Sequence, residues 1–134
     1  MTSSIFSTFV VCLFFFIGLA EANSFSACLP SSVASFAAGT PQHTNITAQS
    51  FRNDLVKSRF VVLAKSAQDV QAAVKCAAKN GLKVCARSGG HSFVAKSSCP
   101  GVMIDVSPMR KVWVNPNTKI AHVGAGANLS LIHI

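Results

Sequence analysis

The residues best suited to chemistry form a short run around two adjacent glycines. Directly after a predicted β-strand, the run consists of Arg87, Ser88, Gly89, Gly90, His91 and Ser92. Paired glycines let the backbone adopt positive φ and approach a ligand closely, so that successive N–H groups point toward one phosphate. Arg87 and the two serine hydroxyls would add donors to the same anion, with His91 at the rim. The alternative interpretation is a tight turn with a solvated histidine.

A second glycine cluster, Gly124, Ala125 and Gly126, follows a predicted hairpin and could pack against the same ligand. It lacks the third glycine and the following helix of a dinucleotide-binding fingerprint. Taken alone, this cluster favours a flexible turn.

A strand-helix-strand unit is predicted to position the first run. Residues 60–64 are β-branched and aromatic, which is typical of a buried strand. Ser66 and Asp69 supply an N-cap hydroxyl and an acidic N3 side chain, so a helix is predicted to begin there and to end before Gly81. Residues 82–87 are the second strand, and the crossover is expected to be parallel and right-handed. The apolar face of the helix is predicted to contain Val70, Ala73, Val74, Ala77 and Ala78.

Elsewhere in residues 23–134, no second helix is predicted as clearly by the sequence. Three short strands are predicted at residues 102–106, 111–114 and 119–123, and the last two resemble an antiparallel hairpin around a Pro-Asn turn. Residues 23–50 are predicted to be a loose lead-in with at most a short helix at 32–38. The predicted fold class is therefore α+β, a β-α-β unit followed by an antiparallel β-meander.

The N-terminus has the features of a secretory signal. Residues 9–20 contain no charge, and small residues flank Glu21 in a pattern that signal peptidase accepts, which predicts cleavage after Ala22. The apolar run is too short for a stable membrane span, so we expect a secreted, extracellular protein. The alternative is an uncleaved anchor, because no Lys or Arg precedes the apolar run. The Asn45-Ile46-Thr47 sequon is predicted to be glycosylated there, whereas Asn128-Leu129-Ser130 is treated as a chance match.

Removal of residues 1–22 leaves four cysteines, Cys28, Cys76, Cys85 and Cys99. An even count in an exported chain favours two disulfides, and three pairings are possible. No Cys or His spacing indicates a metal site. The mature chain has 12 basic and three acidic residues, a formal charge of +9. Half of the full-length sequence is hydrophobic and 12% is charged, which argues against disorder.

The order of several segments resembles a known family. The strand Phe-Val-Val-Leu-Ala, the helix Ser-Ala-Gln-Asp-Val-Gln-Ala-Ala-Val and the segments Arg-Ser-Gly-Gly-His-Ser, Met-Ile-Asp-Val-Ser and Val-Gly-Ala-Gly-Ala lie within residues 55–128. Together they resemble the FAD-binding domain of berberine-bridge-enzyme-like oxidoreductases, part of the wider vanillyl-alcohol-oxidase-like (PCMH-type) flavoproteins. The resemblance adds a partial PCMH-type domain (55–134) to the predicted signal peptide (1–22) and lead-in (23–54).

The resemblance also implies roles for individual residues. Residues 87–92 would hold the FAD pyrophosphate, and His91 would form a covalent bond to a methyl group of the flavin. Gly124, Ala125 and Gly126 would lie close to the flavin, next to a strand and turn that contain Asp105 and Ser107. Cys28 and Cys76 match the disulfide of the family, which would leave Cys85 and Cys99 for each other.

Departures from the family limit what can be assigned. Residues 93–99 replace the aromatic and small acidic loop of the family, and similarity stops after Asn128. Such proteins are several times longer, so we expect this chain to be an incomplete and inactive piece of an oxidase that acts on an alcohol, sugar or alkaloid-like substrate. The sequence contains no Tyr, and no catalytic residue is assigned.

The alternative function is a small secreted basic module that binds anionic partners without catalysis. Its support is the basic residues spread over the first part of the domain, Arg52, Lys57, Arg59, Lys65, Lys75, Lys79 and Lys83. Lysines spaced along a helix are more often a solvated face than a binding patch. Nucleic-acid binding is not predicted, because the charges are not clustered with exposed aromatic residues.

Overall fold

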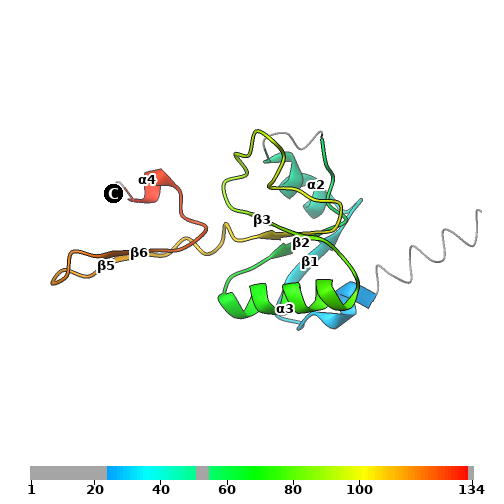
Figure 1. Ribbon diagram of the computed structural model, residues 1–134, viewed down its shortest axis with the longest axis horizontal. Coiled ribbons are helices and arrows are strands. Elements are labelled where there is room, and N and C mark those ends of the chain that lie inside the picture. Colours follow the sequence, from blue (N-terminus) through cyan, green and yellow to red (C-terminus); the bar gives the residue numbers. More distant parts are fainter. Residues whose placement is uncertain (1–23, 51–54, 133–134) are drawn as a thin grey trace, which may run out of the picture.

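The computed structural model describes residues 24–50 and 55–132. An α/β body and a projecting hairpin make up the molecule (Figure 1). This arrangement confirms the α+β class. The predicted signal peptide lies outside the described residues.

The body is built on a four-stranded sheet in the order β1-β2-β4-β3. Its strands are β1 (Ala34–Ala37), β2 (Phe60–Leu63), β3 (Val84–Arg87) and β4 (Val102–Asp105). β1 pairs with β2 in antiparallel orientation, whereas β2 and β3 both pair with β4 in parallel. The strands of the predicted β-α-β unit are therefore parallel, as expected, but β4 lies between them.

The predicted meander is correct only for its last two strands. β5 (Val112–Val114) and β6 (Ala121–Val123) form the antiparallel hairpin, with Val112 opposite Val123. Residues 102–106 were expected to belong to the same meander, but β4 inserts in parallel between β2 and β3. All four residues of β4 are buried, because a central parallel strand is covered on both faces.

Residues 24–50 belong to the body and are not a loose lead-in. Residues 34–37 form β1 where a short helix was predicted, because they pair with the free edge of β2. The helix α2 (Pro41–Ala48) follows, and Thr40 caps it by accepting a hydrogen bond from the His43 N–H. Upstream, Phe25 is fully buried with its ring centroid 4.7 Å from that of Phe60.

The helix α3 (Ala67–Lys79) begins as predicted. The Ser66 hydroxyl accepts from the Asp69 N–H at 3.2 Å, and the Asp69 carboxylate accepts from the Ser66 N–H at 3.1 Å. At the other end Gly81 has φ +64°, and the Leu82 N–H donates to Ala77 O at 2.9 Å. This is a Schellman end, which directs the chain back toward the sheet.

The buried face of α3 differs in part from the predicted one. Ala73 and Ala77 are buried as expected, but Val74 is 43% exposed and Ala78 is also exposed. Cys76 is buried instead, because its disulfide with Cys28 turns this side of the helix toward the N-terminal segment.

The two faces of the sheet are covered differently. α3 covers one face, and α2 together with the segment after β3 lies on the other (Figure 1). That segment is a crossover, because it connects the end of β3 to the start of the parallel strand β4. It contains no helix. The first glycine run is part of this crossover.

Candidate functional site

Arg87, the last residue of β3, is anchored beneath the first glycine run. The parallel register places it beside Asp105 of β4, and its Nη1 donates to Asp105 Oδ2. Both side chains are buried, at 4% and 2% exposure. Asp105 Oδ1 also accepts from the Ser107 N–H at 2.8 Å. Arg87 therefore has a partner within the protein, and its contact with a bound anion stays a prediction.

The two glycines after Arg87 lie in close packing, and Gly90 also has a positive φ. Gly90 has φ +74°, and a Cβ added there would lie 3.1 Å from both Arg87 Nε and Ser50 Cα. At Gly89 the same atom would lie 3.3 Å from the His91 imidazole. Any larger residue at these positions would shift the loop away from α2 or displace the histidine ring.

The backbone of this loop presents free donors. In the described part of the chain, the N–H groups of Ser88, Gly89, Gly90 and His91 donate to no other group. Within the same residues, the buried Arg87 Nε also has no hydrogen-bond partner. Buried or clustered N–H groups without partners are costly unless a ligand or water accepts from them.

The second glycine cluster brings two backbone segments together. The Gly124 and Gly126 N–H groups donate to Lys111 O and Met109 O, each at 2.9 Å. A Cβ on Gly124 would lie 2.1 Å from Met109 O, and one on Gly126 would lie 2.1 Å from Val106 O. Both contacts are too short for any side chain, so these glycines serve the packing of the hairpin base.

An open cavity of about 780 Å³ lies where the two glycine clusters meet. Its lining consists of Gln49, Arg87, Ser88, Gly89, His91, Ser107, Arg110, Gly126, Ala127, Asn128, Leu129 and Ser130. Of the predicted residues, Gly90, Ser92, Gly124 and Ala125 are outside this lining. The Ser92 hydroxyl instead accepts from the Lys96 N–H at 2.9 Å within its own turn.

Sequence reasoning missed part of this lining. Gln49 comes from the C-terminal cap of α2, and its Oε1 accepts from Arg87 Nη2 at 3.5 Å. Arg110 follows the turn after β4, and residues 128–130 begin the short helix α4 (Leu129–Ile132). No local pattern marks Arg110 as part of the lining, because its place depends on how the segment after β4 packs beside the crossover after β3.

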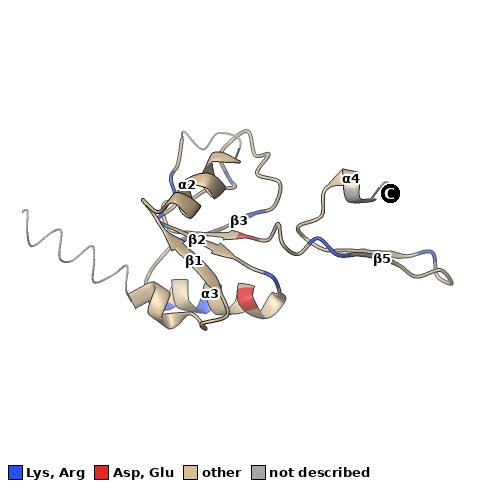
Figure 2. Ribbon diagram, turned by 180° about the vertical axis from the view of Figure 1, so that it is seen from behind, with Lys and Arg blue, Asp and Glu red and all other residues tan. Residues whose placement is uncertain are grey.

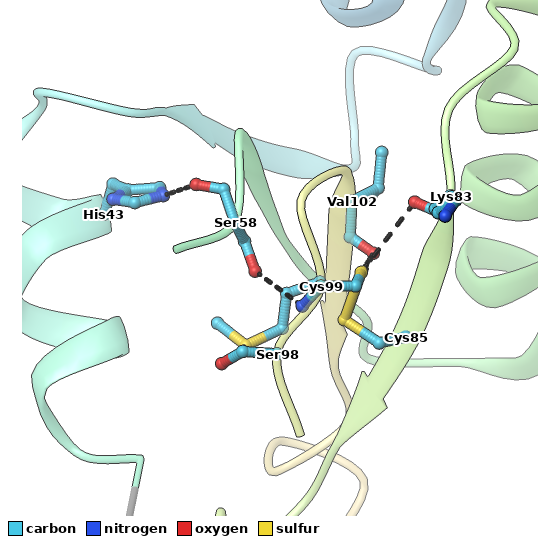
Figure 3. Close-up of a disulfide and its surroundings, with 8 residues drawn as sticks. His43, Ser58, Lys83, Cys85, Ser98, Cys99 and Val102 are labelled. Carbon is cyan, nitrogen blue, oxygen red and sulfur yellow. Dashed lines mark hydrogen bonds between the residues drawn. A yellow bond between two sulfur atoms is a disulfide. The ribbon is translucent and has the colours of Figure 1, made fainter. Parts of the chain in front are cut away.

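The described residues form two disulfides, and one of them closes the crossover at the site. Cys28 pairs with Cys76, as the resemblance implied, and Cys85 pairs with Cys99. Figure 3 shows the second pair beside Ser58, whose hydroxyl accepts from the Cys99 N–H at 3.5 Å and whose carbonyl contacts His43 Nε2 at 2.8 Å. Because Cys85 lies in β3 and Cys99 shortly before β4, this bond closes the crossover that carries the first glycine run.

Three further observations concern metal binding, membrane insertion and surface charge. Across residues 24–50 and 55–132, no group of three or more His, Cys, Asp or Glu side chains is arranged to bind a metal. No helix in that part of the chain is long and apolar enough to cross a membrane. The Lys and Arg residues are spread over the body and the hairpin (Figure 2).

Comparison with known proteins identifies the family. Residues 58–133 match the family described as FAD binding domain, so the similarity continues past Asn128, where it was expected to stop. The chain belongs to this family. Its curated relatives include the FAD-linked oxidoreductase pynB of Aspergillus niger, 39% identical over 76 residues that cover 56% of this chain and 14% of that protein. Berberine bridge enzyme-like 3 of Arabidopsis thaliana is 40% identical over 79 residues, which cover 55% of this chain and 14% of the relative.

Solved structures confirm the fold of this FAD-binding domain. BBE-like #28 from Arabidopsis thaliana has a TM-score of 0.72 at 21% identity, covering 83% of this chain and 24% of that one. The Bermuda grass isoallergen BG60 also has a TM-score of 0.72, at 24% identity, covering 84% and 25%. The predicted resemblance to berberine-bridge-enzyme-like proteins is confirmed, and the chain spans about a seventh of the length of its first curated relatives.

The cofactor of this domain family is FAD, and the cavity fits its diphosphate group. The lining contains two arginines and no Asp or Glu. The free N–H groups of the first glycine run are also donors, and they suit an acceptor-only ligand such as a phosphate. These donors would therefore bind an anion, and no carboxylate in the lining would repel it.

Proposed function

We propose that residues 55–134 form the phosphate-binding part of a secreted FAD-dependent oxidoreductase. The observation that carries this proposal is the row of free N–H groups from Ser88 to His91 beside a cavity without acidic side chains. These donors, with Arg87 in the cavity wall, would hold the diphosphate. Asp105 would keep the loop in place through its ion pair with Arg87.

His91 is the proposed site of covalent flavin attachment. It is exposed, lines the cavity and lies against Gly89, so its imidazole is accessible to a ligand held by the loop. Attachment would prevent loss of the cofactor outside the cell. Bound FAD supplies the two-electron acceptor for oxidation of an alcohol, sugar or alkaloid-like substrate in the full-length protein.

Secretion is part of the same proposal. It rests on the uncharged run at residues 9–20 and on two disulfides, which persist in oxidising compartments. The non-catalytic basic module receives no specific support from the distribution of charge.

The test is flavin fluorescence in a denaturing gel after acid treatment, applied to the secreted chain and to His91→Ala. We expect a fluorescent band for the unchanged chain and none for His91→Ala, with equal secretion of both. The matched control is His122→Ala, because His122 packs against Trp113 in the hairpin and does not line this cavity. Covalent flavin that persists in His91→Ala would contradict the assignment.

A further inference from the structure

Two arginines line the cavity, and they differ in how their charge is used. The Arg87 guanidinium is buried and paired with Asp105. Arg110 is exposed, and no hydrogen bond or ion pair joins its side chain to any other described residue. Because Asp105 compensates Arg87, Arg110 carries the uncompensated positive charge of the cavity wall.

The hairpin base holds the backbone on both sides of Arg110. Met109 O and Lys111 O accept from the Gly126 and Gly124 N–H groups, and the Met109 N–H donates to Val106 O at 2.9 Å. The 2.1 Å approach of a hypothetical Gly124 Cβ to Met109 O shows how closely these segments pack. The second glycine cluster thus fixes the position from which Arg110 extends.

We propose that Arg110 binds the diphosphate of FAD and complements the N–H donors of the first glycine run. This inference rests on the proposed function of the cavity. A guanidinium has five N–H donors in a planar arrangement that matches phosphate oxygens. Since no other described residue accepts from the Arg110 side chain, its donors are available to a phosphate. The segment after β4 then contributes to the same anion as the crossover after β3.

Lys111 provides a matched control. It is the neighbouring basic residue and is also exposed, but it lines a separate cavity of about 320 Å³ with Trp113 and His122. A general effect of the basic surface would be the same for both residues. A specific contact with the diphosphate would be lost only in the Arg110 variant.

The experiment measures reversible binding of FAD and of riboflavin to the full chain carrying His91→Ala, which removes the proposed covalent link. Riboflavin has the same ring system as FAD but no phosphate. We expect Arg110→Gln to weaken FAD binding about tenfold, the size of an exposed charge-assisted contact, and to leave riboflavin binding unchanged. Arg110→Lys should retain part of the affinity, and Lys111→Gln should retain all of it.

Salt gives an independent readout. FAD affinity of the parent chain should fall with ionic strength more steeply than that of Arg110→Gln, because added ions screen the exposed guanidinium. Equal FAD affinity of Arg110→Gln and its parent would overturn the inference, as would an equal loss of riboflavin binding. If the parent chain binds neither ligand, the proposed function itself fails, and this result is distinct from a failure of Arg110 alone.

Discussion

The α/β body and the β5–β6 hairpin differ in how much of their apolar surface is buried. In the body, Phe60, Val61 and Val62 of β2 are at most 1% exposed. In the hairpin, Trp113, Val114 and Val123 are 50%, 53% and 45% exposed. The body therefore has its own hydrophobic core, whereas a lone two-stranded hairpin is marginally stable in water.

The cavity is lined by residues from both regions, so substitutions on its two sides should differ in their effect on protein stability. The loop with His91 follows Arg87, whose side chain forms a buried ion pair with Asp105 of β4. A substitution that breaks this pair should therefore destabilise the sheet. The residues on either side of Arg110, Met109 and Lys111, accept hydrogen bonds from Gly126 and Gly124 at the exposed hairpin base. Changes to the buried Arg87–Asp105 pair should alter the free energy of unfolding as well as binding, whereas changes on the hairpin side should mainly alter binding or local opening.

The largest expected effect compares one aromatic residue from each region. Phe60→Ala should lower the free energy of unfolding by about 4 kcal/mol, because it leaves a void beside the ring of Phe25. Trp113→Ala should lower it by less than about 1 kcal/mol, because this ring is half exposed. Urea unfolding of both variants measures the two values. Equal losses would contradict the view that the body buries its apolar side chains and the hairpin does not.

A smaller effect is expected from the disulfide that closes the glycine crossover. Replacing both Cys85 and Cys99 by Ser should lower the free energy of unfolding by about 3 kcal/mol, the entropy of closing a loop of ~15 residues. Hydrogen exchange should increase most between these positions. Faster exchange only in the hairpin would contradict the view that this bond stabilises the body side of the cavity.

The smallest effect concerns the hairpin turn. Lys119 has φ +59°, a conformation that costs little for Gly, so Lys119→Gly should stabilise the hairpin by less than about 1 kcal/mol. The Asn115 N–H, which donates to Ile120 O at 2.9 Å, should then exchange more slowly. Lys111→Gly, where φ is not positive, serves as the control and should show no such slowing.

Local signals predicted most of the elements correctly. The capping box of Ser66 and Asp69 and the end at Gly81 gave the limits of α3, since each acts within a few residues. The apolar runs located β2 and β4, and the Pro-Asn turn located the hairpin. The proximity of the two glycine clusters was also anticipated, and one cavity now contains residues from both.

Long-range pairing explains what the sequence did not reveal. β1 is a strand because β2 offers an edge to it, although its alanines also suit a helix. The pairing of Arg87 with Asp105 depends on the parallel register of two strands, and no local pattern specifies that register. For the same reason Arg110 was not recognised as part of the cavity.

The order of the strands also constrains biosynthesis. β4 is the last strand of the sheet to be translated, yet it supplies the hydrogen-bonding partner of both β2 and β3. Until residue 105 has emerged from the ribosome, these two strands have no common partner, whereas both Cys28 and Cys76 are already available. β1 and β2 can pair before then, but completion of the sheet must wait for β4, and until then the nascent chain exposes apolar strands that a chaperone can bind.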